Sequence, residues 1–195
     1  MQIVQPLRTK ADIEKMKGSL KARSLRDYAL FVLGINTGLR VTDILSLRIR
    51  DVMEPTARDV RVRDRVEVVE KKTRKRRDVP LNKSARSALR EYLSKTPLRF
   101  REDSPLFPSR NGRGELPISR YMVWLILKLA AEECGIRDRI GTHTMRKTYG
   151  YQLYMDRVDI TRIQYALNHS SPAITLAYIG ITRDDIDKQI LSLNL

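Results

Sequence analysis

The sequence predicts a mainly α-helical fold that carries a small antiparallel β-sheet in its first half. Over most of the chain, apolar residues recur at the three- and four-residue spacing of amphipathic helices. Between residues 59 and 81 the period changes to two, because valines alternate there with charged residues. A length of 195 residues allows one domain with a proper core and is too short for two, so we expect a single domain over 1–195.

Cap residues and glycines mark the ends of the expected helices. Thr9 precedes Asp12 by three positions, as in a capping box, which predicts that the first helix begins there. A second helix is expected over 24–37 and ends at Gly38, a residue suited to a C-cap with positive φ. "VTDILSL" then resumes as a short helix. The remaining helices are expected over residues 84–94, 119–133, 144–154, 159–168, 172–178 and 182–191.

The strands are expected in "DVRVRDRVEVVEKKTRKRRDVPL", where alternation with charged residues indicates that one face of each strand is buried. The alternating apolar positions are Val60, Val62, Val66 and Val68. We expect two or three short antiparallel strands, with hairpin turns near Asp64 and near 73–75. The Pro- and Gly-rich residues 96–117 predict a loop region.

The charge of the chain points to a polyanionic partner. Thirty-eight Lys and Arg against 23 acidic residues give a net charge of +15 and a pI near 10.2. Such an excess favours nucleic acid, because each neutralised phosphate releases condensed counterions. A membrane is disfavoured: the apolar run "YALFVLGI" is too short to span one, and we find neither a strongly apolar basic helix nor a lipidation motif.

The compartment follows from the N-terminus and from cysteine usage. The first residues, "MQIVQPLRTKADIEKM", lack the apolar core of a signal peptide, so we expect a soluble intracellular protein. Cys134, the single cysteine, can form no internal disulfide, which fits a reducing compartment.

Three short segments carry residues suited to phosphate chemistry. In "TGLRVTDIL", Arg40 follows a Gly turn; such an arginine is usually a solvated charge, but a helix N-terminus beside it would help it bind an anion. In "THTMRKTYGY", His143 and Arg146 are three apart and share one helix face. In "LNHSSPAITLAYI", Tyr178 follows His169 by nine positions, which ordinary packing would also explain.

A fourth segment, "KKTRKRR", has six basic residues in seven and runs from Lys71 to Arg77. A solvated hairpin or a nuclear-localisation patch has the same composition. The alternation on both sides favours a folded hairpin, and a hairpin tip this basic suits a groove or the backbone of DNA.

Several other chemistries lack their residues. Two histidines and one cysteine offer no metal-ligand cluster, so no metal is expected. There is no Gly-x-Ser-x-Gly elbow, no Walker loop and no Gly-x-Gly-x-x-Gly, which disfavours serine hydrolases and nucleotide cofactors. We therefore expect no cofactor.

Read in order, the four segments give Arg, Lys, His-x-x-Arg, His and Tyr, which closely resembles the catalytic signature of the tyrosine recombinase (phage integrase) family. The resemblance covers nearly the whole chain and three ordered boxes, "TGLRVTDIL", "HTMRKT" and "LNHSSPAITLAYI". It implies the tyrosine recombinase catalytic-domain fold and a site-specific DNA recombinase that integrates, excises or inverts DNA. The alternatives are a type IB topoisomerase, which resembles the family in fold and active site, and a non-catalytic DNA-binding regulator.

The resemblance also implies roles for individual residues. Tyr178 would attack a backbone phosphate and form a 3′-phosphotyrosine, and His143 would accept its proton. His169 would donate a hydrogen bond to the phosphate. A lysine on the hairpin would protonate the leaving 5′-oxygen, and the family pattern counted back from "VPL" selects Lys72 over Lys71. The phosphate-clamping arginines would be Arg40 and Arg146. The expected DNA-binding residues are Lys71, Arg74, Lys75, Arg76, Arg77 and Lys147.

The sequence departs from the family pattern at a few positions. Met145 stands where leucine is common, Lys147 where histidine is frequent and Asp43 where glutamate is common. None of these changes removes a catalytic group. The catalytic pattern begins almost at Met1, so the N-terminal core-binding domain of most members is expected to be absent; the chain is either a catalytic-only member, as some bacterial DNA invertases are, or a fragment.

Assembly and location also follow from the resemblance. It implies double-stranded DNA as partner, a homotetramer on DNA and a cytoplasmic, nucleoid-associated bacterial protein. The tail after Tyr178 would dock either on its own domain or on a neighbouring subunit.

Overall fold

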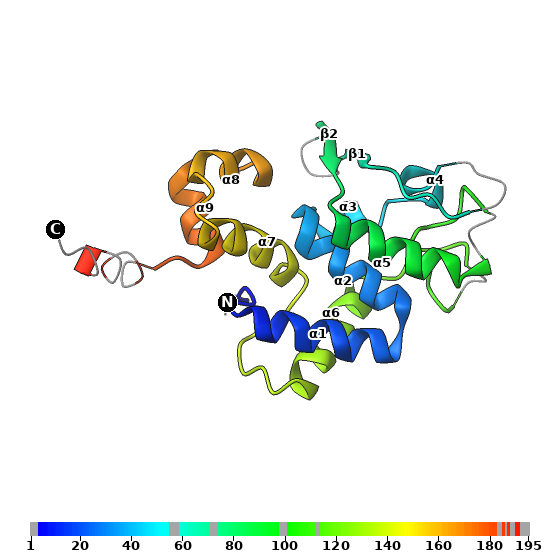
Figure 1. Cartoon of the computed structure of the whole chain (residues 1–195), viewed down its shortest axis with the longest axis horizontal. Helices are drawn as coiled ribbons and strands as arrows, with labels where there is room; N and C mark the ends of the chain where they lie inside the picture. The colour runs from blue at the N-terminus through cyan, green and yellow to red at the C-terminus, as the bar shows by residue number, and fades with distance from the viewer. Residues whose placement is uncertain are drawn as a thin grey trace.

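The computed structural model describes residues 4–54, 59–70, 74–97, 101–111, 114–182, 185, 187, 190 and 191. The predicted mainly helical fold with a small antiparallel sheet is confirmed (Figure 1). In chain order the elements are α1 (Lys10–Arg23), α2 (Leu25–Thr37), α3 (Val41–Ile44), α4 (Ile49–Val52), β1 (Arg65–Val69), β2 (Arg76–Pro80), α5 (Lys83–Ser94), α6 (Arg120–Glu133), α7 (Thr144–Met155), α8 (Ile160–Leu167) and α9 (Pro172–Ile179). Of the helix expected over 182–191, the structure describes residues 182, 185, 187, 190 and 191, and the last four of these are helical.

Helix ends form where the cap residues are. Thr9 Oγ1 accepts a hydrogen bond from the Asp12 amide at 3.0 Å and starts α1. Gly38 ends α2 with a φ of +62°. A Cβ on Gly38 would lie 2.4 Å from the Tyr149 ring, so both its backbone conformation and its close approach to α7 require glycine. The glycine therefore fixes the turn that leads into Arg40.

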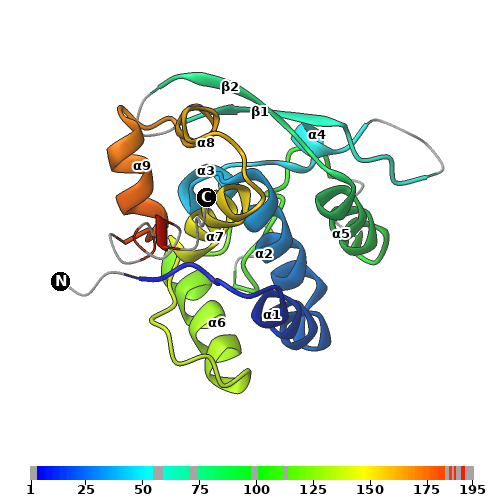
Figure 2. The same ribbon diagram turned by 60° about the vertical axis from the view of Figure 1, so that its left-hand side comes forward.

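The sheet has two strands in the described residues, where the sequence predicted two or three. β1 and β2 pair antiparallel from Arg65 opposite Pro80 to Val69 opposite Arg76. Among the described residues the third strand is reduced to a single bridge between Met53 and Val62. Figure 2 shows the hairpin crossing above α8, and the Arg77 guanidinium donates to the Ala166 carbonyl at the end of that helix, at 2.7 Å. The hairpin is thus attached to the segment that leads into His169.

Buried side chains form two clusters. The large cluster lies among α1–α6 and the hairpin, and it includes Met145 at the start of α7. The small cluster consists of Tyr151, Ile163, Leu167 and Ile179, from α7, α8 and α9. Figure 1 shows α7, α8 and α9 gathered on one side of the molecule. Helix α7 belongs to both clusters and carries the His-x-x-Arg box between them.

Nothing in the described part of the chain is both long enough and apolar enough, as a helix, to cross a membrane.

Candidate active site

Tyr178 lies beside both histidines of the chain. Helix α9 begins at Ser171, whose hydroxyl accepts from the Ile174 amide at 3.2 Å, with Pro172 in the first turn. Seven residues on, the Tyr178 hydroxyl is 3.2 Å from His143 Nδ1. The Tyr178 ring also packs edge-on against His169, with centroids 4.8 Å apart. The structure thus brings together three side chains that the sequence places in two separate boxes.

Burial sets the protonation state of this group. It raises the pKa of the Tyr178 phenol, against the opposing effect of Arg146 and Arg40, so the hydroxyl is protonated at neutral pH. Burial, with the charges of Arg120 and Arg146, lowers the pKa of His143. A neutral imidazole therefore lies within hydrogen-bond distance of a protonated phenol, which is the arrangement that general-base catalysis needs.

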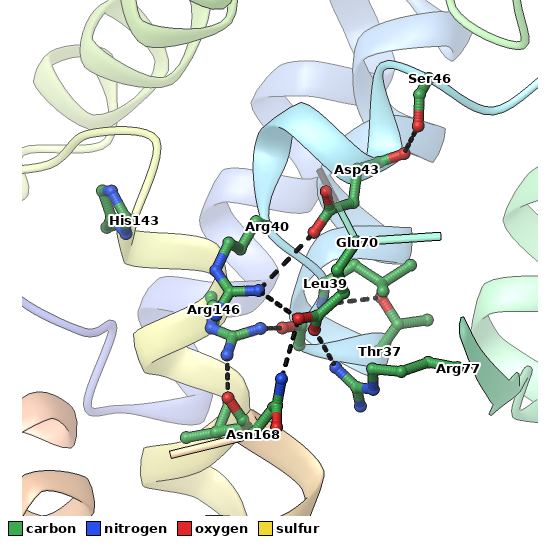
Figure 3. A network of polar contacts seen from close by, with 12 residues as sticks. Thr37, Leu39, Arg40, Asp43, Ser46, Glu70, Arg77, His143, Arg146 and Asn168 are labelled. Atoms are coloured by element: carbon green, nitrogen blue, oxygen red, sulfur yellow. Dashed lines mark hydrogen bonds and ion pairs between the residues drawn. The ribbon is translucent and has the colours of Figure 1, made fainter. Parts of the chain in front are cut away.

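Arg146 is almost completely buried, with 2% of its surface exposed. Its guanidinium donates to the carbonyls of Gly38 and Leu167, at the C-terminal ends of α2 and α8 (Figure 3). Burial lowers its pKa to about 10, so it stays charged at neutral pH. A guanidinium has five N–H donors, so several remain for another acceptor.

Arg40 is held by a carboxylate from the hairpin. Its Nη1 is 2.8 Å from Glu70 Oε2 and 3.9 Å from Asp43 Oδ2. The same Glu70 carboxylate accepts from Arg77 Nη1 at 3.0 Å and from Asn168 Nδ2 at 2.9 Å, as Figure 3 shows. Arg40 and Arg146 thus lie on neighbouring segments, and one buried acid links Arg40 to the hairpin and to the residue before His169.

His169 is oriented by a neighbouring hydroxyl. Its Nδ1 is 3.2 Å from Thr175 Oγ1, and Thr175 Oγ1 in turn donates to the Ser171 carbonyl at 3.0 Å. Burial, with the charges of Arg146 and Arg40, lowers the pKa of His169 to about 4. At neutral pH the free protein therefore has a neutral ring whose Nδ1 faces Thr175.

The predicted DNA-binding residues divide into three groups. Lys71 lies outside the described residues, as does Lys72, the residue predicted to be the general acid. Arg74, with a φ of +59°, and Lys75 are exposed next to β2. Lys147 lies in the site: burial lowers its pKa, and its Nζ is 5.3 Å from the centre of the Tyr178 ring. Arg76 and Arg77 line a cavity of about 710 Å³ that the hairpin forms with α8 and that reaches His169.

Sequence reasoning missed Glu70 and Thr175. For Glu70 a signal was present: it continues the parity of Val66 and Val68, so the period of two places it on the buried face. A buried acid beside a basic hairpin implies basic partners. Thr175 offered no such signal, because a threonine inside a helix has many ordinary roles. In the part of the chain that the structure describes, no group of three or more potential metal ligands is found.

Comparisons with known proteins agree with this geometry. Residues 8–184 match the phage integrase family. The chain is 41% identical to the probable integrase/recombinase YoeC of Bacillus subtilis over 184 residues, which cover 94% of this chain and 93% of that protein. It is 32% identical over 164 residues to the tyrosine recombinase XerD of Corynebacterium glutamicum, covering 83% of this chain but 50% of XerD.

Solved structures show the same fold. The crystal structure of XerA recombinase aligns with a TM-score of 0.75 and 20% identity, covering all of this chain and 68% of that one. Lambda integrase (75–356), solved as a dimer bound to a COC′ core site, aligns with a TM-score of 0.67 and 18% identity over 93% of this chain and 62% of that one. With a family match over residues 8–184 and the Arg, His-x-x-Arg, His and Tyr residues gathered at one site, this chain belongs to the phage integrase family.

Proposed function

We propose that this protein is a site-specific DNA recombinase that cuts and rejoins strands through a 3′-phosphotyrosyl intermediate. One observation carries the proposal: the Tyr178 hydroxyl lies 3.2 Å from a neutral imidazole base, next to the two arginines of the family signature. The relatives matched over most of this chain are named integrase/recombinase and tyrosine recombinase, which favours this activity over the alternatives.

In the cleavage step, the Tyr178 oxygen forms a bond to the scissile phosphorus while the bond to the 5′-oxygen breaks. His143 Nδ1 takes the phenolic proton, since the two atoms already share a hydrogen bond. The departing 5′-oxygen receives a proton from a lysine of the hairpin, for which we propose Lys72. Rejoining reverses each transfer: a 5′-hydroxyl attacks the phosphotyrosine, and the phenol recovers its proton from His143. No high-energy cofactor is needed, because the phosphotyrosine conserves the bond.

The pentacoordinate phosphate carries more negative charge than the ground state, and the arginines stabilise it. Arg40 and Arg146 present donors to the non-bridging oxygens. The hydroxyl hydrogen of Thr175 points to the Ser171 carbonyl, so His169 Nδ1 must donate to Thr175, and Nε2 of a neutral ring is left bare. His169 therefore donates to the phosphate through Nε2 only as an imidazolium, a form that the approaching anion favours.

DNA would lie along the hairpin and α8. The cavity of about 710 Å³ between them is lined by basic side chains and by the amide of Gln164, and it leads to His169. We propose that the hairpin residues Lys71, Arg74, Lys75, Arg76 and Arg77, together with Lys147, contact the DNA backbone. Assembly as a tetramer on DNA is part of the same proposal.

The experiment that tests the function traps the intermediate. Nicked suicide DNA with candidate sites is incubated with the protein, and the covalent adduct is measured. Wild type should form an adduct and Tyr178→Phe none, although Tyr178→Phe binds DNA as wild type does. Tyr154 packs against the small cluster, and Tyr154→Phe is the matched control, which should form the adduct. An adduct at another residue would refute the assignment. Relaxation without strand exchange between two sites would indicate the topoisomerase, and binding without adduct the regulator.

The leaving-group acid has its own test. Lys72→Ala should slow cleavage about a hundredfold or more on ordinary DNA, the usual scale for loss of a general acid. A substrate with sulfur in place of the bridging 5′-oxygen leaves as a thiolate that needs no proton, so the rate of Lys72→Ala should recover on it. Lys71→Ala should be close to wild type on both substrates. If Lys71→Ala has the defect and the rescue instead, the acid is Lys71.

A further inference from the structure

Glu70 is a fully buried carboxylate in the middle of the basic site, with 0% of its surface exposed. Its Oε2 forms an ion pair with Arg40 Nη1 at 2.8 Å and accepts a hydrogen bond from Asn168 at 2.9 Å, and its Oε1 accepts one from Arg77 at 3.0 Å. These partners come from the start of α3, from the C-cap of α8 and from β2. One side chain therefore joins three segments that are distant in sequence.

Glu70 is surrounded by positive charge. Three guanidinium groups, those of Arg40, Arg77 and Arg146, lie around the site, and like charges repel strongly where little water screens them. A buried carboxylate is costly unless it is paired and hydrogen-bonded, and this one accepts hydrogen bonds from Arg77 and Asn168 and forms an ion pair with Arg40. In the free protein, the Glu70 carboxylate therefore balances part of the positive charge of these arginines.

The geometry also fixes the direction of Arg40. Its Nη1 lies at ion-pair distance from two acids, Glu70 at 2.8 Å and Asp43 at 3.9 Å. The Arg40 side chain keeps 18% of its surface exposed, whereas its Nη1 atom, which pairs with Glu70, is buried. A planar fork anchored at one nitrogen presents its remaining donors in a set direction.

We propose that Glu70 is a positioning residue that holds Arg40 in the orientation in which it binds the scissile phosphate. Glu70 touches no reacting atom; it acts through Arg40. The proposal rests on the proposed recombinase function, and it assigns to the hairpin a second contribution besides its lysine.

The test compares Glu70→Gln with Glu67→Gln. Glu70→Gln keeps the size of the side chain but removes the charge that pairs with Arg40 and replaces one acceptor oxygen by an NH₂ donor. Glu67 lies on the same strand with its side chain on the exposed face, and Glu67→Gln makes the same change of charge. Cleavage is measured in single turnover at saturating DNA, on an ordinary phosphodiester and on a substrate with a methylphosphonate at the scissile position.

The methylphosphonate separates positioning of Arg40 from general support of the fold. Its phosphorus centre is neutral, so it depends less on the arginine charge. Glu70→Gln should cleave the phosphodiester about 10²-fold more slowly than wild type, the scale of a misplaced catalytic group. On the methylphosphonate that defect should shrink at least fivefold, and Glu67→Gln should match wild type on both substrates. DNA affinity should change little.

The outcomes that overturn the proposal are specific. Cleavage by Glu70→Gln within twofold of wild type, or an equal defect on both substrates, would mean that Glu70 does not act through Arg40. If Glu70→Gln does not fold, Glu70→Asp takes its place, since it retains the charge and draws the carboxylate back by one methylene. An intermediate defect that also shrinks on the methylphosphonate supports the proposal; an equal defect or none refutes it. Failure of wild type itself to form the Tyr178 adduct would instead refute the recombinase function.

Discussion

The large cluster and the small cluster support opposite halves of the proposed active site. Arg40 follows α2, whose buried side chains belong to the large cluster, and its partner Glu70 follows β1, whose inner face belongs to the same cluster. Tyr178 lies on α9 and His169 lies between α8 and α9, both next to the small cluster. The arginines proposed to bind the phosphate are therefore supported by the bulk of the fold, whereas the proposed nucleophile lies on α9, which packs with α7 and α8. The two halves should respond differently to mutation.

Two glycines on facing helices make the comparison testable. A Cβ on Gly34 in α2 would lie 2.6 Å from Met145 Sδ, inside the large cluster. A Cβ on Gly150 in α7 would lie 2.6 Å from Ile179 and 2.9 Å from Leu167, inside the small cluster. The same substitution, glycine to alanine, therefore strains the large cluster at Gly34 and the small cluster at Gly150.

The largest effect is expected from Gly150→Ala. The new methyl group must displace Ile179, the neighbour of Tyr178, or Leu167, whose carbonyl accepts from Arg146. A misplaced nucleophile can cost about 10²-fold in rate, so adduct formation should fall by that order while the protein stays folded. Rates of adduct formation and thermal unfolding are measured together.

Gly18→Ala is the control for this substitution. Gly18 lies in α1, and nothing is within 4 Å of a Cβ placed there. This variant should cleave as wild type does and gain up to about 1 kcal/mol of stability from helix propensity. Normal cleavage by Gly150→Ala would show that the small cluster tolerates repacking around the nucleophile.

Gly34→Ala should act mainly on stability. Its Cβ meets Met145 in the larger body of buried side chains, and overpacking of this kind costs about 1–3 kcal/mol. Urea unfolding measures the loss, and titration with suicide DNA measures the activity of each folded molecule. The comparison fails if Gly34→Ala lowers the cleavage rate per folded molecule more than Gly150→Ala does.

Thr175→Val should lower the cleavage rate about tenfold, within the cost of one lost hydrogen bond to a catalytic group. The valine has nearly the same shape but offers His169 Nδ1 no acceptor. Thr175→Ser keeps the hydroxyl and should recover most of the rate. Single-turnover cleavage is the measurement, and equal rates for the valine and serine variants would remove Thr175 from the site.

The smallest effect is a dependence of stability on pH. Burial lowers the pKa of His169 from 6.5 to about 4 and also lowers that of His143, so below pH 6.5 the unfolded chain binds more protons than the folded one. The stabilisation is complete above pH 6.5 and is lost as the pH falls toward 4. Urea unfolding at pH 7.5 and pH 5.5 should show it, and His169→Asn should weaken the trend. An unchanged slope in that variant would contradict the low pKa.

The sequence predicted the elements better than their long-range contacts. Thr9 and Gly38 marked helix ends because caps act locally. The four-residue helix α4 was missed because so short an element shows no periodicity; it depends instead on the Asp51 carboxylate, which accepts from the Arg48 amide at 2.7 Å. The catalytic boxes were found through the family resemblance, but the pairing of Arg40 with Glu70 depends on tertiary packing that no local pattern records.

The two hydrogen bonds of Arg146 to backbone carbonyls determine which site residues a relative without recombinase activity would retain. Removal of the Tyr178 hydroxyl takes away its hydrogen bond to His143 but leaves the packing of the ring in place, and it would end the proposed cleavage. Removal of Arg146 leaves the carbonyls of Gly38 and Leu167 without their buried donor, where the two clusters meet. In a relative that binds DNA but no longer recombines it, Tyr178 can therefore be replaced without loss of the fold. Arg146 would still be retained there, because folding depends on its buried hydrogen bonds.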